Sequence, residues 1–294
     1  MPAKEQGALA RFASRFAEDR VAMIGLGMIV IIMLLAVLAP FIAPQNPYDL
    51  AKVDIMDSRQ PPGVKAGDGF TMWLGSDGVG RDLLSGILYG LRISLAVGLV
   101  SGMIAASIGL VAGLIAAYAG GRTESVIMRI VDLQLSLPSV LVALILVAVL
   151  GKGVDKIILA LVIVQWAYYA RTVRGSALVE RRKEYVEAAR SLGLSHVRTM
   201  LRHILPNCLA PVIVIATVQT AHAISLEATL SFLGVGLPQT EPSLGVLIAN
   251  GFQYMLSGKY WISFFPGLAL LFTIVAINLV GDRLRDVLNP RLEK

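Results

Sequence analysis

The sequence contains little charge and almost no cysteine. Charged residues make up 16% of its 294 residues and hydrophobic residues 56%, whereas soluble proteins carry about 25% charged residues. This composition argues against an ordinary water-soluble enzyme, and it excludes a disordered chain because disorder requires low hydrophobicity. The single cysteine, Cys208, excludes an intrachain disulfide framework, a cysteine-rich zinc site and an iron–sulfur cluster.

Motifs of catalytic and energy-converting sites are also missing. The sequence has no Gly-x-x-x-x-Gly-Lys-Ser/Thr loop, no His-Glu-x-x-His pair and no Ser-His-Asp group. Gly75, Gly78 and Gly80 do not form a phosphate loop, since no Lys-Ser/Thr follows them and no buried strand precedes them. We therefore expect a non-enzymatic chain without catalytic residues, metal ligands or a cofactor of its own.

Long apolar runs are abundant instead. A helix needs about 20 apolar residues to cross the hydrocarbon core of a membrane. Arg171 and Arg174 can extend the shortest run by reaching the membrane surface, and the first run is too long for a signal peptide, whose apolar region has about 7–15 residues. We predict an all-α membrane protein with six transmembrane helices, from the uncharged runs 21–43, 93–121, 133–151, 157–170, 204–226 and 261–281.

The positive charges indicate the orientation of these helices, because Lys and Arg concentrate in cytoplasmic loops. With a cytoplasmic N-terminus, the inside segments hold 18 of the 26 basic residues and the outside segments hold 8. Both termini are therefore predicted to be cytoplasmic, and the net charge of +6 reflects topology rather than nucleic-acid binding. The predicted parts are a cytoplasmic segment 1–20, a first helix 21–43, an external loop 44–92, a five-helix core 93–281 that includes the cytoplasmic loop 171–206, and a cytoplasmic tail 282–294.

The external loop is predicted to end in a helix on the membrane surface. Residues 44–70 are rich in Pro, Gly and Asp and indicate irregular structure. Apolar residues at 83, 84, 87, 88 and 91 then form one helix face.

The span that follows, 93–121, contains small residues four apart, which predict close packing against another helix, or else pore lining: Gly98, Gly102, Gly109 and Gly113.

The loop 171–206 contains a predicted helix, turn and second helix. Residues 184–192 form the first helix, and Gly193 is placed as a left-handed residue that ends it. Ser195 caps a second helix over about 196–205, before Pro206 and Asn207 break or kink the chain as it re-enters the membrane. A DNA-binding helix-turn-helix has the same pattern, but here the second helix leads into a membrane span. A protein-docking elbow is the better interpretation.

These residues resemble the EAA loop of ABC importer permeases. The match consists of Glu187-Ala188-Ala189, then Gly193, then Leu205-Pro206, and it departs from the general pattern at His203, where Ile is usual. Similar matches at 75–95, 227–236, 242–245 and 278–291 resemble C-type permeases of the dipeptide, oligopeptide and nickel branch. Departures include Leu244 for Trp and Asn289 for Asp.

The resemblance implies a MetI-like permease bundle in the bacterial inner membrane. It implies a homologous B-type permease partner, two cytosolic ATPases that use ATP and Mg²⁺, and a periplasmic or extracellular solute-binding protein, with no nucleic acid. The residues expected to couple to the ATPases are Glu184, Glu187, Ala188, Ala189, Gly193 and Pro206. Peptides are the expected cargo; nickel, glutathione and opine-like molecules remain alternatives.

Five further residues are candidates for the substrate path or for contact with the binding protein: His222, Glu227, Asp77, Arg81 and Asp82. Glu227 is an acid near a membrane span, where ionisable residues are often functional, but it can also hold an external loop. His222 can be a packing residue, and the other three can brace their loop. We expect Asp132 to pair with Arg129.

A secondary transporter is the alternative of another class. Such proteins carry charged relay residues in the membrane or discontinuous helices in repeated halves, and neither is evident in the sequence.

Overall fold

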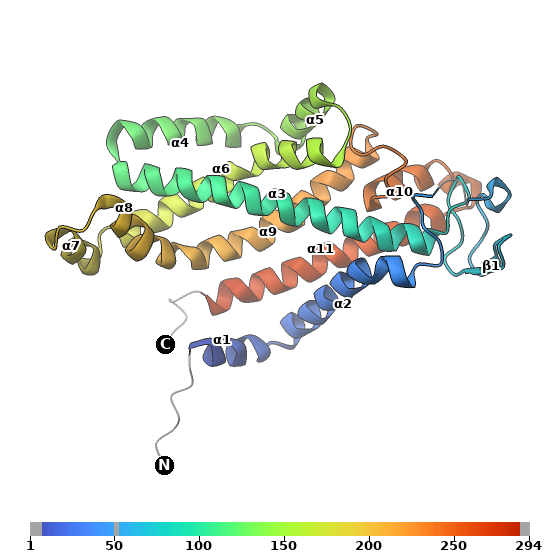
Figure 1. Cartoon of the computed structure of the whole chain (residues 1–294), viewed down its shortest axis with the longest axis horizontal. Helices are drawn as coiled ribbons and strands as arrows, with labels where there is room; N and C mark the ends of the chain where they lie inside the picture. The colour runs from blue at the N-terminus through green and yellow to red at the C-terminus, as the bar shows by residue number, and fades with distance from the viewer. Residues whose placement is uncertain (1–7, 50–52, 289–294) are drawn as a thin grey trace, which may run out of the picture.

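The computed structural model describes residues 8–49 and 53–288, and most of them are helical (Figure 1). A short antiparallel pair, β1 and β2, lies before the third helix, and a π-helical turn at Met200–Ile204 joins α8 to α9. The elements are α1 (Ala8–Ala17), α2 (Arg20–Ile42), β1 (Val64–Lys65), β2 (Thr71–Met72), α3 (Leu83–Ala119), α4 (Gly121–Ser136), α5 (Ser139–Leu150), α6 (Val154–Glu180), α7 (Glu184–Ser191), α8 (His196–Thr199), α9 (Leu205–Phe232), α10 (Leu244–Phe252) and α11 (Trp261–Val287).

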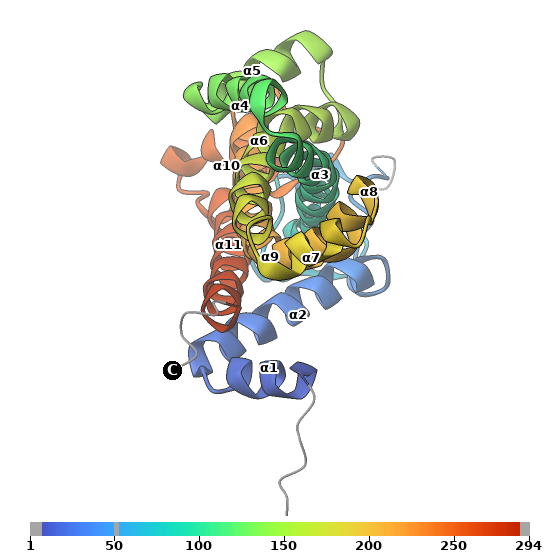
Figure 2. The ribbon, with the colours of Figure 1, turned by 90° about the vertical axis from the view of Figure 1, so that its left-hand side faces the viewer.

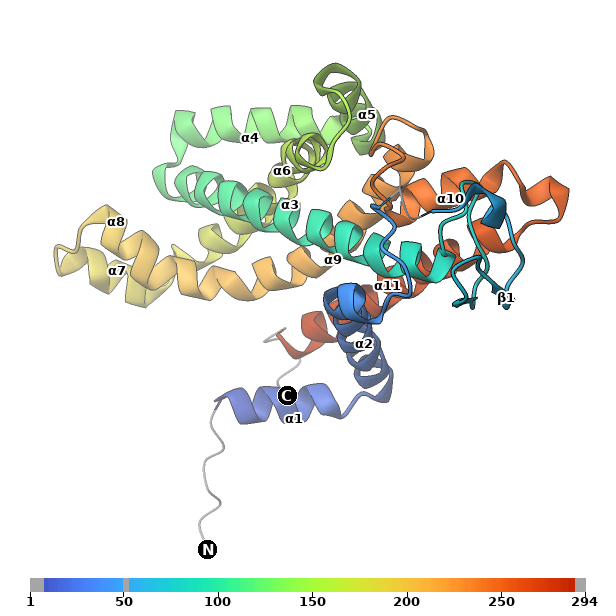
Figure 3. The ribbon, with the colours of Figure 1, turned by 45° about the vertical axis from the view of Figure 1, so that its right-hand side comes forward.

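The long helices form a bundle. α3 packs against α6 and α9, while α11 packs against α9 and α2. Viewed along the bundle, α2 and α1 lie on the side of α11 (Figure 2). Figure 3 shows α7 and α8 at one end and α10 with β1 at the other. We call these the α7 end and the α10 end.

Five helical stretches of the described residues are long and apolar enough to cross a membrane: Arg20–Ile42, Leu83–Ala119, Val154–Glu180, His196–Phe232 and Trp261–Val287. The count reaches six if α4 and α5 together form one broken span. The all-α membrane fold is confirmed.

The predicted span at 133–151 is not one continuous helix. α4 ends at Ser136, α5 begins at Ser139, and the two helices are bent by 91°. Pro138 is the cause, because a proline forces the residue before it out of the helical region. Leu137 accordingly has the extended angles φ −92° and ψ 140°.

α3 and α6 extend furthest beyond their uncharged runs, and α9 and α11 also end later than predicted, at Phe232 and at Val287 within the predicted tail. The helix expected at 83–92 is not separate, since it forms the first turns of α3, which continues for 37 residues. Asp82 caps it by accepting a hydrogen bond from the Ser85 N–H at 2.7 Å. Similarly, α6 continues past 170 to Glu180, so the first part of the expected loop 171–206 is helical. A charged residue ends an apolar run but does not end a helix.

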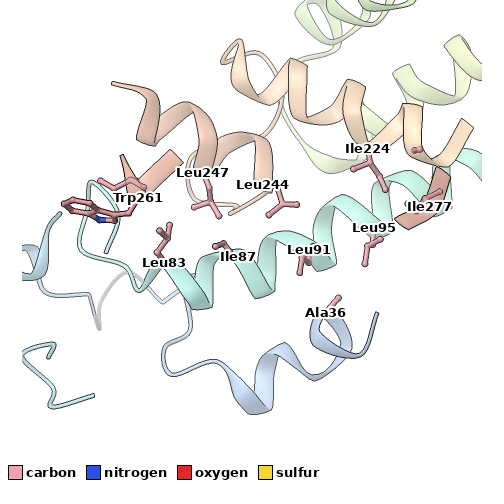
Figure 4. Packing of buried hydrophobic residues seen from close by; sticks show 12 residues of the cluster. Ala36, Leu83, Ile87, Leu91, Leu95, Ile224, Leu244, Leu247, Trp261 and Ile277 are labelled. Carbon is pink, nitrogen blue, oxygen red and sulfur yellow. The ribbon is translucent and has the colours of Figure 1, made fainter. Parts of the chain in front are cut away.

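One face of α3 forms the main packing surface near the α10 end (Figure 4). Leu83, Ile87, Leu91 and Leu95 are buried and spaced four apart, so they share a helix face. They belong to the same cluster as residues of α10, α9 and α11, namely Leu244, Leu247, Ile224, Trp261, Ile262 and Ile277. This packing fixes α10 against the bundle.

The small residues of α3 allow close contact with α6 and α9, as predicted. A Cβ atom on Gly98 would lie 2.7 Å from Ile224 Cγ1, and one on Gly113 would lie 2.6 Å from the Ala170 carbonyl oxygen. Such distances leave no room for a side chain. The glycine series therefore serves packing inside this chain.

Candidate functional site

The α7 end carries most of the residues singled out in the sequence. α7 begins at Glu184, and its buried side is formed by Val186 and Ala189, which are 0% and 3% exposed. Val186 packs in a cluster with residues of α3, α6 and α9. On the other side, Glu184, Glu187 and Ala188 are exposed. The helix is thus anchored by one face and presents an acidic, open face.

The turn after α7 has the predicted geometry. Gly193 has φ +72°, in the left-handed region that favours glycine. The Leu194 N–H donates to the Ala189 carbonyl at 3.2 Å, which is the six-to-one bond of a Schellman motif. Ser195 then caps α8 by accepting from the Arg198 N–H at 3.4 Å. Sequence reasoning therefore identified both ends of this turn correctly.

The second helix merges into the span, as expected, through a wider turn, and Pro206 does not break the chain, since His196–Phe232 is one continuous helical stretch. The Leu205 N–H bonds to the Met200 carbonyl, five residues earlier. Pro206 lies at the start of α9 and has no N–H to donate. The π-helical turn accommodates this missing donor, and Ile204 and Cys208 on either side are buried in the same cluster as Val186.

A polar network beside α7 was missed by the sequence reasoning. Glu180, the last residue of α6, accepts from Lys183 Nζ at 2.6 Å and from the Tyr185 hydroxyl. The Asn207 side chain donates to the Tyr185 hydroxyl at 3.1 Å and to the His203 carbonyl at 2.9 Å. Desolvation, followed by the hydrogen bond to Glu180, raises the pKa of Tyr185 to about 12, so the hydroxyl is protonated at neutral pH. No single motif predicts this network, since its members come from three elements.

A second contact connects α3 to the same region. Arg181 donates to the Ala117 carbonyl at 2.8 Å and lies over the ring of Tyr118. The Tyr118 hydroxyl is 2.7 Å from His196 Nδ1. The segment from Arg181 to His196 is therefore tied to the last turn of α3 as well as to α6 and α9.

Two ion pairs join α4 to α6 near this end. Asp132 pairs with Arg171, not with Arg129 as expected. Arg174 Nε donates to Glu124 at 2.9 Å. The expected partner was wrong because α4 lies alongside α6, which offers Asp132 an arginine of the neighbouring helix.

At the α10 end, Asp77 and Arg81 form a buried ion pair. Arg81 Nε donates to Asp77 Oδ2 at 2.7 Å, and Arg81 Nη1 donates to the Gln239 carbonyl at 3.1 Å. Asp82 accepts from Ser85 and is also buried, and burial raises the pKa of Asp82. These three side chains brace the loop before α3 and connect it to the segment before α10. A cavity of about 450 Å³ opens beside this turn, between Ile55 and Tyr254.

Glu227 is fully buried in the bundle, where α3 and α9 meet. It accepts hydrogen bonds from Ser94 at 3.0 Å and from Ser231 at 2.8 Å. Its environment supports an internal brace. His222, five residues earlier on α9, is half-buried, and its Nδ1 atom has no hydrogen-bond partner among the described residues. Within the described part of the chain, no group of three or more His, Cys, Asp or Glu residues could hold a metal ion.

Two family models match the chain. Residues 109–294 match "Binding-protein-dependent transport system inner membrane component", and residues 8–62 match "N-terminal TM domain of oligopeptide transport permease C". Residues 289–294, which include the last part of the C-terminal resemblance, lie outside the described residues.

Curated relatives match over nearly their whole length. The dipeptide transport system permease protein DppC of Escherichia coli K12 is 41% identical, over 97% of this chain and 94% of that protein. A putative peptide transport system permease protein of Brucella abortus is 41% identical over 96% and 91% of the two chains. The di/tripeptide transport system permease protein DppC of Pseudomonas aeruginosa is 38% identical over 97% and 93%.

Among solved structures, an inward-facing MetNI methionine ABC transporter chain resembles the fold with a TM-score of 0.57 at 21% identity. That likeness covers 69% of this chain and 96% of the other. An amino acid ABC transporter chain gives a TM-score of 0.51 at 16% identity, covering 68% and 93%. These likenesses concern the fold.

Proposed function

The chain belongs to the family of binding-protein-dependent transport system inner membrane components, and on that premise we propose that it is the C-type permease subunit of an ATP-driven importer of dipeptides or oligopeptides. The cargo is supported by the names of its relatives, two of which are dipeptide or di/tripeptide permeases. The chain provides half of the translocation path, and a homologous B-type subunit provides the other half.

In this importer, α7 is the element through which ATP hydrolysis in the partner subunits is coupled to transport. The observation that carries this assignment is the two-sided character of α7, with Val186 and Ala189 buried in the chain and Glu184, Glu187 and Ala188 exposed. The exposed face carries Glu187 and Ala188 of the segment that resembles the EAA loop, and we assign it to contact with a cytosolic ATPase. The chain itself is non-catalytic and holds no cofactor, and two partner ATPases use ATP and Mg²⁺.

The orientation follows from the same assignment. The α7 end and both termini face the cytoplasm of the bacterial inner membrane, in agreement with the concentration of Lys and Arg in those segments. The α10 end faces the solute-binding protein on the outside. Because Asp77, Arg81, Asp82 and Glu227 are buried, they brace this end, and the binding protein contacts exposed residues around them. His222 is the candidate for the substrate path that keeps partial exposure.

Uptake by the reconstituted complex tests the proposal. The chain is co-expressed with the B-type, ATPase and binding-protein subunits of the same genome and placed in proteoliposomes. We expect labelled dipeptide uptake that requires both ATP and the binding protein, and no uptake by the chain alone. Uptake of Ni²⁺ in place of peptide would refute the cargo, and uptake by the single chain driven by an ion gradient would refute the whole assignment.

A further inference from the structure

We propose that Tyr185, held between Glu180 and Asn207, is a positioning residue that fixes the angle of α7 to the membrane helices and thereby transmits its movement to them. This inference rests on the proposed docking of an ATPase to α7. We call the three residues the α7 latch. Glu180 and Tyr185 precede the segment that resembles the EAA loop, which begins at Glu187, and Asn207 directly follows its Leu205-Pro206 pair.

The latch joins three elements through one hydroxyl group. Glu180 ends α6, Tyr185 lies in the first turn of α7, and Asn207 lies in the first turn of α9. The hydroxyl donates to the Glu180 carboxylate and accepts from the Asn207 amide at 3.1 Å. The Glu180 side chain is only 11% exposed, so water competes weakly for this acceptor.

The apolar contacts of α7 cannot set its angle alone. Its buried side consists of Val186 and Ala189, both small, and hydrophobic contact is non-directional. At the other end of the helix, a Cβ atom on Gly193 would meet no atom within 4 Å, and the contact of Tyr118 with His196 holds the chain only three residues beyond this turn. Hydrogen bonds depend strongly on direction. The latch therefore supplies the orientational restraint that the packing lacks.

The latch also ends beside the π-helical turn that leads into α9. The π-helical turn at Met200–Ile204 precedes Asn207, whose amide bonds to the His203 carbonyl inside this turn. Such turns occur frequently at functional sites. A tilt of α7 would displace Asn207 through its hydrogen bond to Tyr185. Because Asn207 also bonds to the π-helical turn, the start of α9 would move with it.

The test removes the hydroxyl and keeps the ring. In the reconstituted complex, Tyr185→Phe should lower the maximal rate of peptide uptake about fivefold or more, the size expected for loss of one hydrogen bond. The stimulation of ATPase activity by the binding protein should fall by a similar factor. Membrane abundance, co-purification of the ATPase subunits and the half-saturating peptide concentration should not change. Tyr168→Phe is the matched control, because the Tyr168 hydroxyl makes no hydrogen bond within the described part of the chain and Tyr168 lies on α6, away from the α10 end.

A second variant keeps the test decisive. Asn207 is exposed, so Asn207→Ala removes the other partner without a cavity. It should reproduce the Tyr185→Phe defect, and the double variant should be no worse than either single variant, because both break one unit. If Tyr185→Phe does not accumulate, Asn207→Ala carries the same test. If the defect of the double variant equals the product of the two single defects, Tyr185 and Asn207 act independently and the latch is wrong.

A parallel Glu187→Lys variant separates the latch from the function on which it rests. If Glu187→Lys abolishes stimulation while Tyr185→Phe and Asn207→Ala behave as the Tyr168→Phe control does, the latch is wrong and the docking role of α7 stands. If Glu187→Lys also leaves stimulation unchanged, the docking role is wrong and the latch fails with it.

Discussion

At the residue scale, Gly193 makes the simplest connection between backbone geometry and transport. Its φ of +72° costs a non-glycine residue roughly 1–2 kcal/mol. No atom lies within 4 Å of a Cβ placed there, so the cost of a substitution arises in the backbone and not from a clash. This energy is too small to prevent the bundle from forming, but it is large enough to change the direction in which α7 points.

Gly193→Val should therefore reach the membrane at normal abundance and transport peptide poorly. The β-branched side chain accepts positive φ with more strain than Ala, so Gly193→Ala should show a smaller defect. Immunoblotting of membranes and uptake by the reconstituted complex measure the two effects. Wild-type uptake and wild-type ATPase stimulation by the valine variant would show that this turn has no part in coupling.

Glu227 differs from Gly193 in that its substitution should affect stability. It is a candidate for the substrate path, but its side chain lies buried between two serines. Glu227→Ala would leave the Ser94 and Ser231 hydroxyls without their acceptor and open a cavity, so we expect a loss of about 2–4 kcal/mol in the free energy of unfolding. Glu227→Gln keeps a carbonyl acceptor and should lose less. Thermal unfolding of the detergent-solubilised chain measures both. Unchanged stability with lost transport in both variants would instead assign Glu227 to the substrate path.

At the scale of elements, the sequence predicted helices better than it predicted where they end. The first and last spans match α2 and α11 closely at their starts because an uninterrupted apolar run coincides with the helix there. α3 and α6 extend beyond their runs, since Arg92, Arg171 and Arg174 lie on helices that continue past them. The bend at Pro138 was overlooked because counting charges says nothing about backbone geometry.

The same distinction applies to the site. The turn at Gly193 and the cap at Ser195 depend on neighbours in the sequence, and both could be predicted. The network of Glu180, Tyr185 and Asn207 depends on how α6, α7 and α9 meet in space, which no local pattern encodes. The burial of Asp77 and Arg81 also follows from a distant contact, with the carbonyl of Gln239.

The contact of α3 with α6 gives a prediction with a matched control. A Cβ on Gly113 would lie 2.6 Å from the Ala170 carbonyl oxygen, whereas a Cβ on Gly175 would meet nothing within 4 Å. Gly113→Ala should destabilise the chain by about 1–3 kcal/mol. Gly175→Ala should be neutral or stabilise by roughly 0.5–1 kcal/mol, because alanine favours helix. Thermal unfolding of the two variants tests this prediction. Equal shifts of their unfolding temperatures would contradict the close packing of α3 against α6.

At the scale of the whole molecule, the orientation of the bundle decides which surface meets which partner. Asp68 and Leu192 are exposed near opposite ends, and the single native cysteine, Cys208, is fully buried, so background labelling should be low. In intact cells, an impermeant thiol reagent should label Asp68→Cys directly and Leu192→Cys only after permeabilisation. The reverse labelling pattern would show that the orientation in the membrane is inverted. α7 would then lie outside the cytoplasm and could not contact the ATPase.

Cross-linking from α7 tests the central claim most directly. Ala188 is exposed on α7, and Leu256 is fully exposed near the α10 end. With a photoactivated cross-linker on Ala188→Cys in the assembled complex, we predict a covalent product of this chain with an ATPase subunit; the same reagent on Leu256→Cys should give none. An ATPase adduct from Leu256→Cys and none from Ala188→Cys would contradict the account.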